Sequence, residues 1–260
     1  MSEKLPIPND VKNVHSKERE DPKPSEPLTD WRSIYVAALL GFSCAVQFSV
    51  YFTSLWPYLN VIDKEASETF FGFTIAAFSL GQMISSISFG YWSNRIKSIT
   101  VPMTAGIIAM FVGNLIYLLA SLLQSNVRYA ILAARFMTGF GLGNATLVKT
   151  YASTSCNPKD RHKALAYVTG GVAFGTTIGP AIQIVFTPLG YPGVVFAEGL
   201  SLNMYTAPAY AACLMNLISV IALFTIFKET YAGILKEQQQ EEVSVKYQTT
   251  IIIMKNVERF

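Results

Sequence analysis

Residues 98–127 read SITVPMTAGIIAMFVGNLIYLLASLLQSNV and contain no Asp, Glu, Lys or Arg. A helix needs about 20 apolar residues to cross the roughly 30 Å hydrocarbon core of a bilayer, so this stretch is long enough to span a membrane. A further stretch, 129–150, is apolar apart from Arg135 and Lys149 near its ends. Four others are also free of charge: 33–62, 69–94, 164–197 and 199–227. A soluble domain can bury one such helix but not six, so we expect an all-α membrane protein with six transmembrane helices.

The chain divides into a tail, a bundle and a second tail. Residues 1–32 are polar and mixed in charge, with no apolar core of a cleavable signal peptide. We expect a six-helix bundle over 33–228 and a cytosolic linker or tail over 229–260, with both tails disordered. The predicted spans cover roughly 34–56, 70–92, 99–123, 129–150, 164–187 and 205–227.

Lys and Arg are distributed unevenly among the short loops. Loops 93–98 and 151–163 carry several basic residues, whereas the loops that alternate with them carry at most one. Because basic loops stay on the cytosolic side, both termini are predicted to be cytosolic.

The fifth span places Gly171, Gly175 and Gly179 four residues apart, with Pro180 directly after them. Small residues at this spacing let two helices approach closely within a membrane, and a proline weakens the helix locally. The second span has the same spacing at Ala77, Gly81 and Ser85.

The fourth span contains the most informative motif. Arg135 is followed by Gly139, Gly141 and Gly143, which gives Arg-x-x-x-Gly-x-Gly-x-Gly. A guanidinium inside a membrane costs several kcal/mol unless it faces water or an acceptor, although snorkelling to the interface is the alternative. This run resembles the fourth-helix signature of the major facilitator superfamily.

Three other motifs resemble the same superfamily in the expected order. Gly90 to Arg95 resembles the Gly-x-x-x-Asp-Arg loop after the second helix, with Asn94 in place of the usual acid. A short basic turn of this kind can bind a helix C-terminus or a carboxylate, so the motif residues are expected to hold one conformation of the bundle. Residues 157–165, which include Arg161, resemble the loop between helices four and five. The glycine series ending at Pro180 is similar to the fifth-helix motif.

The resemblance implies a twelve-helix fold made of two six-helix halves, each built from two inverted three-helix repeats. The present chain corresponds to the N-terminal half, and the substrate cavity is expected between the halves, along helices one and four. Three short motifs, 54–59, 79–83 and 203–206, resemble a lysosomal member of the superfamily. This similarity implies a lysosomal or endosomal membrane.

A polar stripe on the first span supports such a cavity. Ser43, Gln47 and Tyr51 lie at helical spacing, and we expect them to line the cavity together with Arg135 and Asn144. A cavity whose buried charge is cationic favours an anionic solute.

The remaining residues indicate neither an enzyme nor a bound cofactor. His15 and His162 have no partners at metal-ligand spacing, and the sequence has no phosphate-binding glycine loop. The expected partners are the lipid bilayer, a small-molecule or ion substrate and a second six-helix half, with no nucleic acid. Tyr231 and Ile234 match a tyrosine-based sorting signal, a short pattern that also arises by chance.

Three functions are consistent with these features. The first is a solute carrier that works by alternating access in an endolysosomal membrane. The second is an anion channel on the same scaffold, with Arg135 as the attracting charge. The third is a truncated half-protein that does not transport, because one wall cannot form a cavity with two gates.

Overall fold

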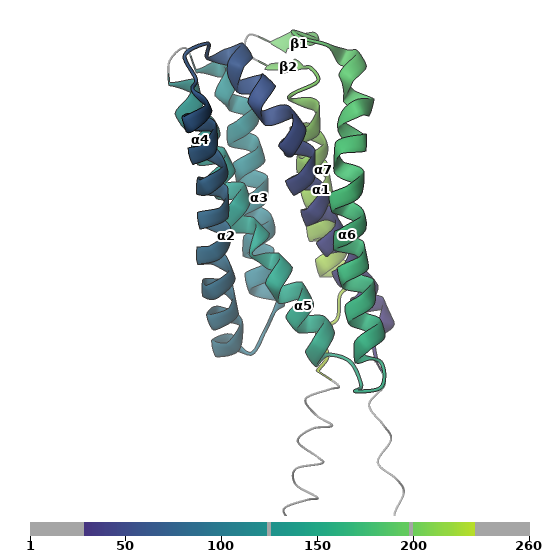
Figure 1. Ribbon diagram of the computed structural model, residues 1–260. Coiled ribbons are helices and arrows are strands. Elements are labelled where there is room, and N and C mark those ends of the chain that lie inside the picture. Colours follow the sequence, from purple (N-terminus) through teal and green to yellow (C-terminus); the bar gives the residue numbers. More distant parts are fainter. Residues whose placement is uncertain (1–28, 124–125, 198–199, 232–260) are drawn as a thin grey trace, which may run out of the picture.

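The computed structural model describes residues 29–123, 126–197 and 200–231. Within this part of the chain, six helical segments are long and apolar enough to cross a membrane, as predicted, and they stand side by side as one bundle (Figure 1). The helices are α1 (Trp31–Ile62), α2 (Glu68–Ile96), α3 (Thr100–Leu119), α4 (Val127–Leu142), α5 (Asn144–Thr154), α6 (Arg161–Phe186) and α7 (Ala207–Thr225). Short 3-10 turns extend α3 over Ala120–Leu122 and α6 over Thr187–Leu189.

Two features of the fold differ from the sequence prediction. The fourth span is not one continuous helix, because α4 ends and α5 begins on either side of Gly143. Three glycines within five residues explain this break, since glycine is a poor helix former. The loop after α6 also contains a small antiparallel hairpin of β1 (Val194–Ala197) and β2 (Leu200–Leu202), which a loop prediction over 188–204 did not include.

The glycine motifs hold two helix pairs together. α6 lies along α1, and α2 lies along α4. A Cβ atom added at Gly175 would come within 2.7 Å of the Phe42 carbonyl oxygen of α1, and one added at Gly139 would overlap the Phe78 carbonyl oxygen of α2. These contacts confirm that the small residues serve close packing of the helix backbones.

The arrangement of these pairs fits two inverted repeats of three spans. The first repeat consists of α1, α2 and α3, and the second consists of α4 with α5, followed by α6 and α7. The first helix of each repeat packs against the second helix of the other repeat. The two repeats are therefore interlocked and cannot be separated as independent units.

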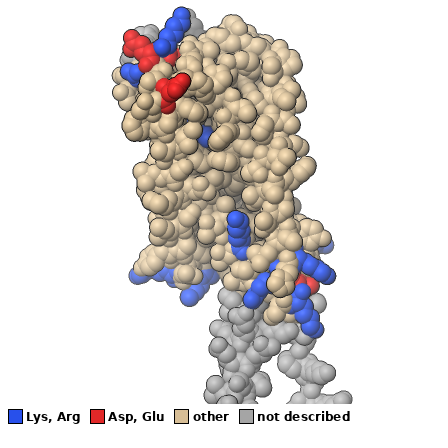
Figure 2. Space-filling view, in the orientation of Figure 1, with Lys and Arg blue, Asp and Glu red and all other residues tan. Residues whose placement is uncertain are grey.

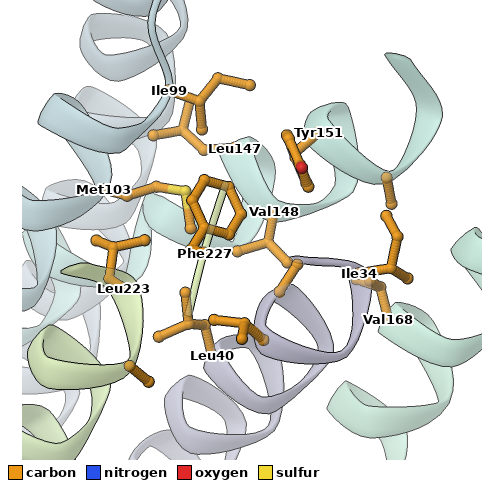
Figure 3. Packing of buried hydrophobic residues seen from close by; sticks show 14 of the residues in the cluster. Ile34, Leu40, Ile99, Met103, Leu147, Val148, Tyr151, Val168, Leu223 and Phe227 are labelled. Atoms are coloured by element: carbon orange, nitrogen blue, oxygen red, sulfur yellow. The ribbon is translucent and has the colours of Figure 1, made fainter. Parts of the chain in front are cut away.

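Apolar side chains fill the bundle in clusters near its two ends. The cluster drawn in Figure 3 joins all six spans at the end where α1 begins and α7 ends, with Phe227 and Val148 near its centre. A second cluster near the other end is built around three packed tyrosines, Tyr58, Tyr117 and Tyr205. Buried polar side chains lie between the two clusters.

Hydrogen bonds close the end of the bundle at which the described chain begins and ends. The Ser33 hydroxyl donates to the Lys228 carbonyl oxygen at 2.9 Å, and the Tyr151 hydroxyl donates to the same oxygen at 2.9 Å. Thr29 donates to Asp160 at 2.9 Å, which ties the start of α1 to the start of α6. These hydrogen bonds therefore join Thr29 and Lys228, near the two ends of the described chain, to the helices of the bundle.

The helices α2 and α6 are the least enclosed. Only 22% and 17% of the residues in their apolar windows are buried, against 72% in α1. They flank one face of the bundle, and Figure 2 shows that this face is uncharged over most of its area, with the charged side chains gathered mainly at the two ends. We refer to this face, formed by α2, α4, α5, α1 and α6, as the open wall.

Candidate functional site

Arg135 lies about two turns into α4, and its side chain is buried. Its guanidinium carbon is 4.5 Å from the centre of the Tyr51 ring and 4.8 Å from the centre of the Phe78 ring. These distances are typical of cation–π contacts, which stabilise a desolvated cation by about 2 kcal/mol. Within the described ranges no carboxylate pairs with Arg135, whereas Arg128 at the end of the bundle pairs with Asp63 at 3.5 Å. The guanidinium is therefore held by aromatic faces and retains its attraction for an anion.

A closed network of side-chain amides lies next to this cation. Gln47 of α1 donates to the Asn216 amide oxygen of α7 at 2.8 Å and accepts from Asn114 of α3 at 3.0 Å. The Tyr51 hydroxyl then donates to the Asn114 amide oxygen at 2.9 Å. All four side chains are buried, and each satisfies the polar groups of another. The network fixes the Tyr51 ring that stacks on Arg135.

These elements surround a small cavity between α1, α2, α3 and α4. Arg135, Gln47 and Asn114 provide its polar lining. The remaining lining residues are Phe48, Tyr51, Phe78, Met110, Thr138 and Leu142. Because a single cation stands among neutral amides and apolar side chains, the cavity is suited to an anionic group.

The structure brings together three of the five residues that the sequence places at the cavity. Gln47, Tyr51 and Arg135 line it, but Ser43 and Asn144 are not among its lining residues. The Asn144 amide donates instead to the Met103 carbonyl oxygen of α3 at 2.8 Å. The break at Gly143 explains the difference, because a turn in the helix redirects the side chain that follows it.

Sequence reasoning missed two members of the amide network and one of the aromatic rings. Asn114 and Asn216 each lie near the middle of a predicted span, and the rule that singled out Gln47 applies equally to them. Phe78 carries no such signal, since a phenylalanine in an apolar helix is ordinary. Its role depends on the packing of α2 against α4.

The glycine motifs act through packing, with one exception. A Cβ atom at Gly143 would overlap the Ser85 hydroxyl of α2, and one at Gly179 would overlap the Ser49 hydroxyl of α1. Gly171 packs similarly against the Ala38 carbonyl oxygen, with 2.9 Å to an added Cβ, and Pro180 lies inside α6. An added Cβ at Gly90 would meet nothing within 4 Å in the described bundle.

The basic loop motifs lie at the end of the bundle near Lys228. Asn94 and Arg95 are exposed in the last turn of α2, and the Arg95 guanidinium donates to the Tyr91 hydroxyl at 3.2 Å. Arg161 is the first residue of α6. A conformational role for these residues remains a prediction.

The first residue of the predicted sorting signal is attached to the bundle. The Tyr231 hydroxyl donates to the Glu229 carboxylate, and its ring packs against the cluster around Phe227. Ile234, the other defining residue of the signal, lies outside the described residues. Among the described His, Cys, Asp and Glu side chains, none form a group of three that is arranged to hold a metal ion.

Comparisons with known proteins agree with this architecture. The model of the Major Facilitator Superfamily matches residues 28–257. The Major facilitator superfamily domain-containing protein 8 of Xenopus laevis is 37% identical over 201 residues, which cover 76% of this chain and 39% of that protein. An SPX domain-containing membrane protein of Oryza sativa subsp. indica is 31% identical over 212 residues, which cover 79% of this chain and 28% of that protein.

Solved structures show the same fold. The proton:xylose symporter XylE bound to 6-bromo-6-deoxy-D-glucose aligns with a TM-score of 0.65 at 17% identity, over 76% of this chain and 45% of that one. The inward open form of XylE from E. coli aligns with a TM-score of 0.59 at 18% identity, over 80% of this chain and 49% of that one. The chain spans about two fifths of the Xenopus relative and about half of the symporter. With its six spans, its interlocked repeats and a family match over most of its length, this chain belongs to the Major Facilitator Superfamily.

Proposed function

We propose that this chain forms the N-terminal half of a non-enzymatic membrane transporter, which moves a small anionic solute across an endolysosomal membrane by alternating access. The observation that carries the proposal is Arg135, a buried cation without a carboxylate partner among the described residues, in a cavity beside the open wall. An unpaired guanidinium is costly inside a membrane, and a transported anion would offset this cost while it is bound.

The charge distribution along the spans also favours an anion. In the described helices, acidic residues occur only at the starts of spans, as with Glu68 of α2, while Arg135 and Lys149 lie within the fourth span. Along the described spans, a solute therefore meets positive charge and no carboxylate away from the helix ends. This distribution attracts anions and repels cations.

The open wall supports a second six-helix bundle as the partner. The small enclosed fractions of α2 and α6, together with the length of the relatives, are consistent with a second half that covers this face. Alternating access would then consist of rocking one interlocked bundle against the other. The endolysosomal location rests on the sequence resemblance to a lysosomal member of the superfamily.

The proposal is tested by anion flux in membrane vesicles from cells that express the chain, where a second six-helix half can pair with it. Uptake of radiolabelled chloride, phosphate and lactate is measured for the wild type, for Arg135→Gln and for Arg128→Gln. We expect Arg135→Gln to lower the uptake of at least one anion tenfold or more, whereas Arg128→Gln, which removes a cation at the end of the bundle, changes it less than twofold.

Other outcomes identify the alternatives. Ohmic single-channel currents that depend on Arg135 would show an anion channel on this scaffold. Cross-linking in the same membranes shows whether the chain pairs with another six-helix chain. Absence of flux that depends on Arg135 for every anion, in membranes where the chain is paired, would overturn the proposal.

A further inference from the structure

A second cavity, which is mostly apolar, adjoins the polar one. It lies between the C-terminal half of α1 and the N-terminal half of α2, and Arg135 of α4 forms part of its lining. We call it the aromatic cavity. Its other lining residues are Phe48, Tyr51, Phe52, Leu55, Phe71, Ile75 and Phe78.

The aromatic side chains of this cavity are held in place by one another. Phe48 of α1 packs against Phe78 of α2 with 5.5 Å between ring centres, and nearby Trp56 packs against Phe71 at 5.3 Å. Phe78 is buried at the base, whereas Phe52 is 67% exposed and Ile75 is 38% exposed. The cavity therefore has a fixed base and a mouth bounded by Phe52 and Ile75.

The base of the cavity offers one kind of polar contact. The guanidinium carbon of Arg135 lies over the rings of Tyr51 and Phe78, and among the described residues no carboxylate pairs with it. Since Arg135 lines the cavity, the N–H donors along its edge remain for a ligand. The Tyr51 hydroxyl already donates to Asn114. A carboxylate matches this edge, because its two oxygens accept two parallel hydrogen bonds from a guanidinium.

The space and its lining together select the shape of the anion. The cavity volume is about 30 Å³, which is room for a carboxylate group and leaves a larger body at the open mouth. The apolar body of a ligand would then lie at the mouth, against Phe52 and Ile75. A hydroxyl-rich solute would leave most of its polar groups unpaired here, and a halide would lose its hydration without gaining from the apolar walls.

We propose that the aromatic cavity binds a monocarboxylate with an apolar body, with the carboxylate on Arg135 and the body between Phe52 and Ile75. This inference rests on the proposed function and narrows the anion to an amphipathic organic acid. It assigns two contributions to separate residues. Arg135 recognises the charge, and Phe52 recognises the apolar body.

The test measures binding of radiolabelled benzoate to the purified chain in lipid nanodiscs, with empty nanodiscs as the blank. Acetate, which lacks the ring, and benzyl alcohol, which lacks the charge, serve as competitors, together with chloride. We expect each of the three to displace benzoate only at concentrations at least tenfold higher than unlabelled benzoate requires.

Two variants separate the two contributions. Phe52→Ala removes an exposed side chain, so the bundle still folds, and we expect benzoate affinity to fall at least fivefold while acetate affinity stays the same. Phe224→Ala, a comparably exposed position on α7, is the matched control and leaves both affinities unchanged. Arg135→Gln removes the preference for benzoate over benzyl alcohol.

Equal affinity for benzoate and acetate, both dependent on Arg135, would overturn this inference and leave the proposed anion site standing. The absence of any anion binding that depends on Arg135 would overturn both. Benzoate affinity that is the same in Phe52→Ala and in Phe224→Ala would overturn the assignment of the aromatic cavity.

Discussion

The Glu229 carboxylate, which follows the last span, accepts a hydrogen bond from the backbone N–H of Ile99 at 2.6 Å. Ile99 is the residue before the first turn of α3, and its own side chain provides no cap for that helix. Glu229 supplies the missing cap from 130 residues away, with further hydrogen bonds from the hydroxyls of Ser98 and Thr100, each at 2.8 Å. A negative charge at a helix N-terminus is also favoured by the helix dipole.

Replacement of Glu229 by alanine removes this cap. We expect Glu229→Ala to lower the free energy of unfolding by about 1 kcal/mol, the usual cost of losing a helix N-cap. Thermal unfolding in detergent micelles measures the change. Glu65→Ala, at an exposed loop position, is the control and leaves the midpoint in place. An unchanged midpoint in Glu229→Ala would show that water replaces the cap without loss.

The same carboxylate makes stability dependent on pH. Burial raises the pKa of Glu229, but hydrogen bonds from Tyr231, Ile99, Thr100 and Ser98 outweigh burial, so its pKa lies below the ordinary value of 4.5. A carboxyl group with a lowered pKa stabilises the fold above its unfolded pKa, and this contribution is lost as the pH falls through its folded pKa. We therefore expect the difference in midpoint between wild type and Glu229→Ala to be constant at pH 6–8 and to shrink below about pH 4. A difference that grows toward acid would contradict this assignment.

Close packing of α2 on α4 depends on Gly139. Because a Cβ atom there would overlap the Phe78 carbonyl oxygen, Gly139→Ala must push the two helices apart. We expect a loss of about 1–3 kcal/mol, typical of overpacking. Gly72→Ala, where a Cβ meets nothing within 4 Å, is expected to be neutral or slightly stabilising, since alanine is the better helix former. Equal effects of the two substitutions on thermal stability would argue against the packing role.

The hydrogen bond between Gln47 and Asn216 couples the first and last spans. A double-mutant cycle with Gln47→Leu and Asn216→Leu isolates their interaction, because the bond that Gln47 also accepts from Asn114 is lost equally in Gln47→Leu and in the double variant. We expect a coupling energy of about 0.6–2 kcal/mol, the range found for hydrogen bonds between membrane helices. Strict additivity of the two unfolding free energies would show that the pair contributes nothing to stability.

The orientation of the bundle remains a prediction from its loop charges. Lys64 and His162 are both exposed and lie at opposite ends of the bundle. In a background without the three native cysteines, a membrane-impermeant maleimide added from the cytosolic side is expected to label His162→Cys and not Lys64→Cys. The reverse pattern would place both termini on the lumenal side.

Charge-free length predicted most of the fold, because the hydrocarbon core sets a minimum length for each span. The predicted spans and the described membrane-spanning segments agree in number and order, although α1 begins at Trp31 and ends at Ile62, beyond the predicted 34–56. The small hairpin was missed, since Val194–Ala197 is continuously apolar and Leu200–Leu202 is too short for an alternation that separates a strand from an apolar loop.

The candidate site was predicted only in part, and the reason is physical. A polar residue in a span is visible in the sequence, which is why Gln47 and Arg135 were found. The partner of a polar residue depends on the rotation of a neighbouring helix, and this is set by packing such as that of Gly139 on α2. The prediction that Asn144 lines the cavity was wrong for the same reason. The turn at Gly143 changes which side of the helix the following side chains occupy, and Asn144 bonds to α3 instead.

The hydrogen bond between Gln47 and Asn216 also has a consequence for membrane insertion, because its two residues are synthesised at different times. A ribosome adds about 5–20 residues per second, so the 169 residues that separate the two amides take about 10–30 s to make. Throughout this interval the first span has already left the ribosome, while its amide partner in the last span does not yet exist. Until the final helix arrives, the Gln47 amide nitrogen lacks its acceptor, and the partner that the chain itself can offer to Gln47 is Asn114 of α3, 67 residues further along.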